Sequence, residues 1–223
     1  MAEVGELYEK KLNCPVCGKE FKTSKVRLSK LRLVKRDSDF LPYYEGENPV
    51  FYGVFVCPHC GYSALEENFT KINFQGRETI KKEISSKWNE RSFLGKRTIE
   101  ESIAAYKLAL FCGELLKDKN YELGNICIRL GWLNRLKEDE DEEERFLSLA
   151  RELFSNAYYN EPLSNESMNP LTVAYLIGEI SRRMGDRDEA IKWFNTVLKD
   201  PEIKDNIALE KMVREQWQVV KEE

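Results

Sequence analysis

The hydrophobic and polar positions follow different periods in the two halves of the chain. Apolar and charged residues alternate between Lys19 and Arg36, and Phe51–Val56 is rich in aromatic and β-branched residues. Both patterns are typical of strands. From Thr98 onward the apolar residues instead recur every three or four positions, which predicts helices. We therefore expect an α+β chain that is mostly α, with a β-hairpin region followed by antiparallel helices.

The helical half divides further by its local start and stop signals. Thr98 and Glu101 form a capping box that opens a helix ending near Leu116. A shorter pattern precedes it, with Ile80, Ile84 and Trp88 at four-residue spacing. Later helices are expected over about 121–137, 144–160, 170–184, 187–200 and 206–221. The chain should thus contain a hairpin domain over 1–75, a linker helix within 76–98 and a helical domain over 99–223.

Four of the six cysteines stand in two matching motifs, which we call the knuckles. They are Cys14-Pro15-Val16-Cys17 and Cys57-Pro58-His59-Cys60, each followed at once by a glycine. Two such pairs can bring four thiolates to one tetrahedral zinc ion. The glycine permits the positive φ that turns backbone N–H groups toward the sulfurs. We predict a zinc ribbon whose structural metal is held by Cys14, Cys17, Cys57 and Cys60, with iron as a possible substitute in the same site.

Other readings of the knuckles stay open. A Cys-x-x-Cys pair can also be redox-active, which would make the protein a redox- or metal-responsive regulator. That chemistry needs a pair that opens a helix beside a sheet, whereas these pairs bracket predicted strands. His59, the single histidine, lies between two ligands and is expected to point to solvent. The remaining cysteines, Cys112 and Cys127, lie among apolar residues of predicted helices and are expected in the core.

The charge distribution gives only limited support for nucleic-acid binding. The net charge is -4, which indicates no general affinity for polyanions. Eight cations between Lys19 and Arg36 could follow phosphates along a basic hairpin. However, residues 1–75 carry 11 basic and 10 acidic residues. A nucleic-acid-binding zinc ribbon is therefore an alternative function.

Several classes of protein are disfavoured by what the sequence lacks. One histidine and no phosphate-binding glycine motif leave no catalytic constellation, so we expect no enzyme. No apolar run approaches the roughly 18 residues of a membrane helix, and the acidic N-terminus does not resemble a secretion signal. We expect a cytoplasmic protein, whose thiols stay reduced.

Two helical segments share a pattern that resembles the tetratricopeptide repeat. One runs from Gly131 and the other from Gly178, and the matching downstream positions are Ala150, Phe154, Ala157 and Pro162 in the first and Ala190, Phe194, Val197 and Pro201 in the second. The resemblance implies paired helices that approach closely at the glycine and alanine. The first copy carries about seven extra residues between its helices, where the acidic run 138–144 lies.

The same resemblance implies a groove along the first helix of each copy. Its lining positions map to Asn125, Ile128, Trp132, Arg135, Thr172, Tyr175, Glu179 and Arg182. Tryptophan and arginine are enriched at binding hot spots. We therefore predict a protein or peptide partner contacted by Asn125, Trp132, Arg135, Tyr175, Glu179 and Arg182. Alternatively, Trp132 and Tyr175 are simply buried against a neighbouring helix.

The whole chain resembles an uncharacterised bacterial family, the domain of unknown function 2225. The resemblance is carried by KLNCPVCGKEF, FVCPHCGYSA, YLIGEISRRMGD and EAIKWFNTVL. It implies a zinc ribbon joined to tetratricopeptide-like helices and adds no activity. The leading hypothesis is a non-enzymatic zinc-binding interaction or scaffold protein.

Overall fold

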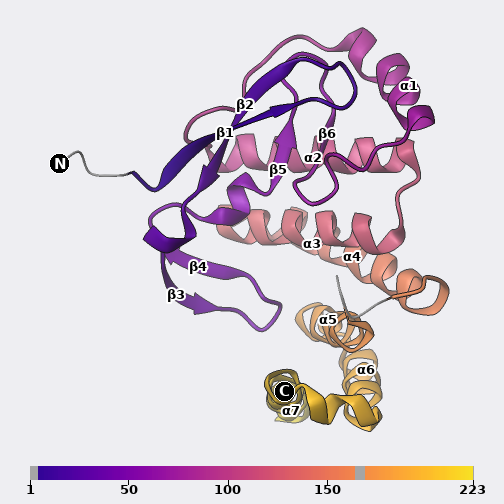
Figure 1. Ribbon diagram of the computed structural model, residues 1–223. Helices are drawn as coiled ribbons and strands as arrows, with labels where there is room; N and C mark the ends of the chain where they lie inside the picture. Colours follow the sequence, from indigo (N-terminus) through magenta and orange to yellow (C-terminus); the bar gives the residue numbers. More distant parts are fainter. Residues whose placement is uncertain (1–4, 164–168, 223) are drawn as a thin grey trace. The chain divides into compact units, whose positions relative to one another are not determined.

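The N-terminal region consists of short hairpins (Figure 1). The computed structural model describes residues 5–163 and 169–222. Within them, three two-stranded antiparallel sheets pair β1 with β2, β3 with β4 and β5 with β6. The strands are β1 Leu7–Asn13, β2 Glu20–Val26, β3 Arg32–Arg36, β4 Pro42–Glu45, β5 Val54–Val56 and β6 Ser63–Leu65.

The rest of the described chain is mostly helical, as predicted. The α-helices are α1 Phe74–Glu83, α2 Ile99–Leu116, α3 Asn120–Lys137, α4 Glu140–Asn160, α5 Pro170–Arg183, α6 Arg187–Lys199 and α7 Ile207–Glu222. The capping box of α2 is confirmed, since the Glu101 N–H donates to Thr98 Oγ1 (3.2 Å) and the Thr98 N–H donates to Glu101 Oε2 (2.9 Å). None of the helices in residues 5–163 and 169–222 has the length and apolarity needed to cross a bilayer.

The predicted basic hairpin over residues 19–36 is wrong. A 3₁₀ turn at Leu28–Lys30 separates β2 from β3, and each strand pairs with a different partner. β1 supplies the partner of β2, in register from Leu7 opposite Val26 to Asn13 opposite Glu20. The cause is that β1 lies in a polar segment whose sequence carries little strand signal.

The predicted strand Phe51–Val56 is also shorter than expected. A 3₁₀ turn occupies Pro49–Tyr52, and the Asn48 side chain accepts from the Val50 N–H at its start. Only Val54–Val56 remain as β5. Proline favours the first position of such a turn, because it has no N–H that would need an acceptor there.

The chain forms two compact units that interleave along the sequence. The first unit contains Met1–Arg36, Pro42–Asp118 and Arg129–Glu143, and the second contains Asp37–Leu41, Lys119–Ile128 and Glu144–Glu223. This grouping differs from the predicted domains over 1–75, 76–98 and 99–223. In particular, α2 belongs with the hairpins.

Helix α2 joins the first unit because two-stranded sheets need a cover for their apolar face. It packs against β5 and β6. The fully buried Tyr106 donates from its hydroxyl to the Val50 carbonyl (2.9 Å). A Cβ on Gly53 would lie 2.3 Å from that hydroxyl oxygen, so this close approach needs glycine.

A buried arginine ties the segment before α2 to the hairpins. Arg97 is 3% exposed and donates to the carbonyls of Phe93 (3.2 Å), Phe51 (3.0 Å) and Val54 (3.0 Å). Its guanidinium also lies over the ring of Tyr52. Burial lowers the pKa of Arg97 from its ordinary value, and the carbonyl oxygens offset part of that desolvation.

In the second unit, glycines allow close contact between helices. A Cβ on Gly178 of α5 would lie 2.8 Å from the Phe194 ring of α6, and one on Gly124 of α3 would lie 2.7 Å from the Phe154 ring of α4. Gly124, seven residues before the Gly131 that we expected to begin the first copy, is thus the glycine that lies against Phe154. Seven residues are almost two helical turns, so both glycines lie on nearly the same face of α3.

The acidic run opens α4 and lengthens it toward its N-terminus. Glu140–Glu143 form the first turn of α4, where negative charge is favoured by the helix dipole. Asp139 accepts from the Glu142 N–H (3.3 Å). A hydrogen bond from the Lys137 ammonium, together with that N–H, lowers the pKa of Asp139. The acidic run, expected between two helices, thus lies mostly within α4.

Candidate metal centre

Both knuckles adopt the same backbone geometry. The Gly18 N–H donates to the Cys14 carbonyl (2.9 Å), and the Gly61 N–H donates to the Cys57 carbonyl (3.0 Å). Each glycine has φ of +75°, a value that glycine adopts without steric cost. A second hydrogen bond closes each turn. The Cys14 N–H donates to the Lys19 carbonyl (3.0 Å), and the Cys57 N–H donates to the Tyr62 carbonyl (2.9 Å).

Each knuckle forms the turn of its own hairpin. Cys14 and Cys17 lie between β1 and β2, and Cys57 and Cys60 lie between β5 and β6. The predicted zinc ribbon instead placed its basic hairpin, over residues 19–36, between the two knuckles. Strand pairing therefore fixes each pair of cysteines separately, and packing of the two hairpins brings the pairs together.

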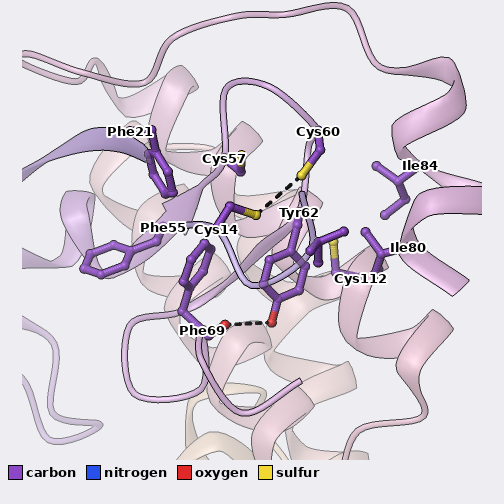
Figure 2. Packing of buried hydrophobic residues seen from close by; sticks show 11 residues of the cluster. Cys14, Phe21, Phe55, Cys57, Cys60, Tyr62, Phe69, Ile80, Ile84 and Cys112 are labelled. Atoms are coloured by element: carbon purple, nitrogen blue, oxygen red, sulfur yellow. Dashed lines mark hydrogen bonds between the residues drawn. The ribbon is translucent and has the colours of Figure 1, made fainter. Parts of the chain in front are cut away.

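The four sulfurs converge on one point, and Figure 2 draws those of Cys14, Cys57 and Cys60. Cys14 Sγ lies 3.6 Å from Cys60 Sγ, Cys17 Sγ lies 3.7 Å from Cys57 Sγ, and all four lie within 4.8 Å of one another. A disulfide would need about 2.05 Å. An ion bonded to four sulfurs at about 2.3 Å in tetrahedral geometry separates them by about 3.8 Å. The donor set and its spacing therefore fit a metal ion.

An aromatic layer encloses the sulfurs. Cys14, Cys57 and Cys60 are buried, and Cys17 is half-buried. The ring of Phe69 lies against three other rings of this core, with centroid distances of 5.8 Å to Phe21, 5.7 Å to Phe55 and 4.9 Å to Tyr62. The Tyr62 hydroxyl donates to the Phe69 carbonyl (3.1 Å; Figure 2). Water is largely excluded, so the site is closed and suited to a structural role.

The protons of the cluster are shared unevenly. Hydrogen bonds from the thiols of Cys57 and Cys60 lower the pKa of Cys14 to about 4. The hydrogen bond to Cys14 raises the pKa of the Cys60 thiol, and the Cys57 contact and burial raise it further. Several thiolates in so dry a place repel one another, and a cation at their centre would stabilise them.

The segment after α1 holds the second knuckle from outside. Trp88 Nε1 donates to the Pro58 carbonyl (2.7 Å), and Ser85 Oγ donates to the Cys60 carbonyl (3.0 Å). His59 Nδ1 lies 3.1 Å from Glu90 Oε1, so the ring contacts this segment and does not join the sulfurs. The four-residue spacing of Ile80, Ile84 and Trp88 predicted one helix, but α1 ends at Glu83. Trp88 lies beyond the helix and donates to the Pro58 carbonyl instead.

The other cysteines occupy core positions, as predicted. Cys112 of α2 is buried in the same apolar cluster as the sulfurs, outside the group of four. Burial raises the pKa of the Cys112 thiol to about 12. Cys127 of α3 is also buried.

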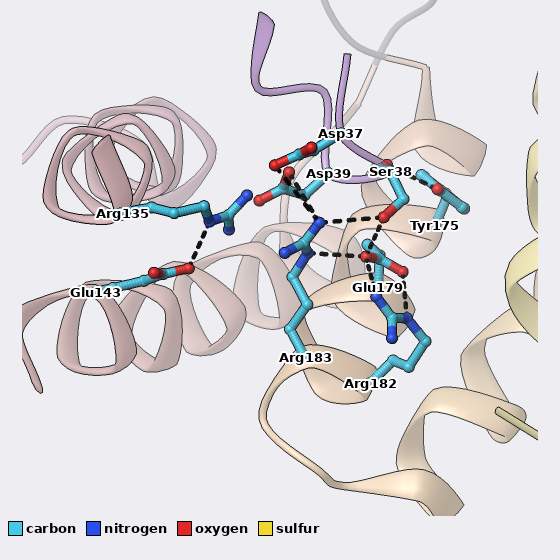
Figure 3. A network of polar contacts seen from close by, with 9 residues as sticks. All are labelled: Asp37, Ser38, Asp39, Arg135, Glu143, Tyr175, Glu179, Arg182 and Arg183. Carbon is cyan, nitrogen blue, oxygen red and sulfur yellow. Dashed lines mark hydrogen bonds and ion pairs between the residues drawn. The ribbon is translucent and has the colours of Figure 1, made fainter. Parts of the chain in front are cut away.

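The predicted groove residues are divided between the two units. Tyr175 and Glu179 are fully buried in the second unit, where Arg182 Nε donates to Glu179 Oε2 (3.0 Å) and Asn125 is half-buried. In the first unit Trp132 is half-buried, and Arg135 Nε donates to Glu143 Oε1 (2.7 Å; Figure 3). Their role in partner binding stays a prediction.

A loop between β3 and β4 contacts residues of the predicted groove. The Tyr175 hydroxyl donates to the Ser38 carbonyl (2.7 Å), and Ser38 Oγ donates to Glu179 Oε1 (2.5 Å; Figure 3). The ring of Phe40 lies 5.5 Å from the Tyr175 ring, centroid to centroid. We call Asp37–Leu41 the tip loop. In the sequence, only the cluster of acidic and aromatic residues in this loop could have indicated that it contacts α5.

Comparison with known proteins identifies the family. A family model described as "Uncharacterized protein conserved in bacteria (DUF2225)" matches residues 7–220. The chain belongs to this bacterial family, which confirms the resemblance. A protein of Borreliella burgdorferi, itself called "Uncharacterized protein", is 25% identical over 228 residues, covering 84% of this chain and 81% of that protein. No solved structure matches.

Proposed function

We propose that this member of the family is a non-enzymatic zinc-binding interaction protein. Zinc would hold the hairpins of the first unit. The side of α5 that carries Tyr175, Glu179 and Arg182, which we call the α5 face, would bind a peptide segment of a partner protein. One observation carries the proposal: Tyr175, Glu179 and Arg182 were expected to face a partner, and Tyr175 and Glu179 contact a peptide segment, the tip loop.

Zinc is supported by the chemistry of the four donors. Four cysteine sulfurs in a closed, largely dry tetrahedral site are the usual structural set for zinc, and iron can occupy a similar site. Isolated two-stranded hairpins are marginally stable. Metal binding would therefore contribute directly to the folding free energy of the first unit. The proposal places the protein in the cytoplasm, where thiols stay reduced.

A tetratricopeptide-like arrangement is supported by the two glycine–phenylalanine contacts. Gly124 against Phe154 and Gly178 against Phe194 repeat the same relation between successive helices. Stacked helical pairs present binding faces along their first helices. In this proposal α3 and α5 are the first helices of two copies.

The contacts of α5 are suited to peptide recognition. The Tyr175 hydroxyl binds a main-chain carbonyl, a group that every peptide carries. Glu179 accepts from a side-chain hydroxyl, and it is held by Arg182 through two contacts of 3.0 Å. Together these groups can read both the backbone and the side chains of a bound segment.

Two measurements test the proposal. Protein purified without added metal should contain about one equivalent of zinc, and an iron-loaded or metal-free protein would contradict the zinc assignment. Tagged full-length protein should capture specific partners from a bacterial lysate, and Arg182→Gln should lose them. Arg214→Gln, the same change at an exposed ion pair of α7, is the matched control. Identical partners with both variants would exclude the α5 face.

The alternative of nucleic-acid binding receives less support because two cations of β2 are already paired. Lys22 pairs with Glu9 (2.6 Å), and Lys25 pairs with Glu66 (2.5 Å). Such pairing reduces the charge offered to phosphates. A salt titration with single- and double-stranded probes separates the two functions, since affinity that falls steeply with salt would favour nucleic acid.

A further inference from the structure

We propose that the tip loop is an internal ligand of the α5 face, and that a partner displaces it by presenting the same chemistry. The partner segment would be an acidic turn in which two carboxylates flank a small hydroxyl residue and an aromatic residue follows. This inference rests on the proposed peptide-binding function and names its ligand. The tip loop reads Asp-Ser-Asp-Phe-Leu.

The charges of the loop complement those of the helix. Arg183 Nη2 lies 3.6 Å from Asp39 Oδ1 and 4.0 Å from Asp37 Oδ2, and it donates to Ser38 Oγ (3.2 Å; Figure 3). Asp39 is fully buried, and a buried carboxylate needs a charged or hydrogen-bonding partner. Arg183 therefore selects acidic residues on either side of the hydroxyl.

The α5 face is organised without help from the loop. Arg182 contacts Glu179 with both Nε (3.0 Å) and Nη2 (3.0 Å), and Arg183 Nε donates to Glu179 Oε1 (2.9 Å). These three residues lie three or four positions apart on one helix, the spacing at which side chains meet. If the loop leaves, the Glu179 carboxylate keeps its cationic partners, so the site remains ready for another ligand.

Tyr175 recognises two further features of the segment. Its hydroxyl binds the Ser38 carbonyl, and its ring packs against Phe40 at an interplanar angle of 47°. Contacts between aromatic rings contribute about 0.5–1.5 kcal/mol beyond the area that they bury. An aromatic residue two positions after the hydroxyl residue is therefore part of the predicted partner.

Backbone strain in the tip loop weakens its binding to the α5 face. Phe40 has φ of +75°, a left-handed conformation that costs about 1–2 kcal/mol in a residue other than glycine. The loop is carried by the two-stranded β3–β4 hairpin, whose register shifts between Leu33 and Lys35 and whose strand β3 is exposed along its whole length. A partner segment without this strain can compete with the loop.

The covalent connection of the tip loop to the rest of the chain compensates for this weak intrinsic binding. A segment joined to its site by a short linker acts at an effective concentration of about millimolar. A free peptide must compete with that concentration in the wild-type protein. Weakening the tip loop should therefore raise the apparent affinity for a peptide added in trans, by about tenfold or more.

The test uses a fluorescent peptide with the sequence of residues 35–43 and the full-length, metal-loaded protein. Fluorescence anisotropy should show weak binding to wild type and at least about tenfold tighter binding to Asp37→Asn/Asp39→Asn. Phe40→Ala, which keeps both charges, should also bind more tightly and covers the case in which the double variant does not fold. Adding Arg183→Gln to either variant should abolish the gain.

The controls are matched in charge. Glu152→Gln/Glu215→Gln removes the same two charges from exposed positions and should bind like wild type. A peptide with asparagine at both aspartate positions should not bind. Equal affinity of wild type and both loop variants, equal binding of the neutral peptide, or no binding to any variant would overturn the inference.

Two outcomes separate this inference from its premise. If Arg182→Gln loses lysate partners but the acidic peptide does not bind, the α5 face remains a binding face and only the proposed ligand is wrong. If the wild-type protein is a dimer that dissociates on Asp37→Asn/Asp39→Asn, the loop is exchanged between two copies, and displacement by a partner is wrong.

Discussion

The hydroxyl of Tyr175 donates a hydrogen bond to the main-chain carbonyl of Ser38, 2.7 Å away and 137 residues earlier in the sequence. This contact makes the tip loop and α5 parts of one compact unit. It also explains why a tyrosine expected on an open groove is fully buried. Of the two expectations for Tyr175, burial is confirmed, because Phe40 of the tip loop and Phe194 of α6 lie against its ring. Partner binding stays a prediction.

Loss of one ligand should unfold the hairpins of the first unit. Cys57→Ser replaces a buried sulfur with a poor metal ligand, and the lost metal affinity becomes lost folding free energy of several kcal/mol. Metal analysis and circular dichroism should show an apo protein with a lower melting temperature. Cys112→Ala, a change at a buried cysteine outside the four, should retain the metal. Full metal content in Cys57→Ser would contradict the assignment.

The contact from Trp88 should control how firmly the metal is held. Trp88→Phe keeps an aromatic ring and removes the Nε1 donor to the Pro58 carbonyl. A hydrogen bond contributes about 1 kcal/mol net, so metal release to a chromophoric chelator should become several-fold faster. Trp217→Phe on α7 serves as the control for loss of an indole. If both variants release metal at the wild-type rate, the contact has no role in retention.

The Gly178–Phe194 approach should not tolerate a methyl group. Gly178→Ala places a Cβ 2.8 Å from the Phe194 ring, and such overpacking costs about 1–3 kcal/mol. Chemical denaturation should show this loss. The double variant Gly178→Ala/Phe194→Leu should destabilise by less than the sum of its single changes, because the smaller side chain makes room. Additive effects would mean that the two residues are not in close contact.

Acid should weaken the first unit through Glu66. Burial raises the pKa of this carboxyl, but the ammonium groups of Lys25 (2.5 Å) and Lys10 (2.9 Å) outweigh burial and the net pKa is lowered. A lowered folded-state pKa contributes stability that is present above the unfolded value of 4.5 and is lost as pH falls through the folded value. Glu66→Gln should therefore be less stable than wild type near neutral pH.

Urea denaturation at several pH values checks this prediction. The difference in unfolding free energy between wild type and Glu66→Gln should shrink as the pH falls below 4.5. Glu78→Gln, at an exposed ion pair with Lys81, should show little difference at any pH. A pH-independent difference at Glu66 would indicate a packing effect instead of ion pairing.

Local features of the chain were well determined by sequence. The two knuckles could be recognised because the spacing of two cysteines and a following glycine is itself the geometry of a turn, with φ of +75° at Gly18 and Gly61. The start of α2 followed from Thr98 and Glu101 for the same reason, since capping involves residues only three positions apart. Such interactions are encoded within a few residues, and no distant contact is needed to form them.

Contacts between distant segments were decided only in the tertiary structure. The choice of Gly124 over Gly131 against Phe154 depends on how far α3 and α4 extend, because both glycines lie on nearly the same helix face. The pairing of β2 with β1 depended on a polar strand that carries little signal. The tip loop reaches α5 through Ser38 and Tyr175 because burial and charge complementarity act between surfaces, and periodicity along the chain does not record which surfaces meet.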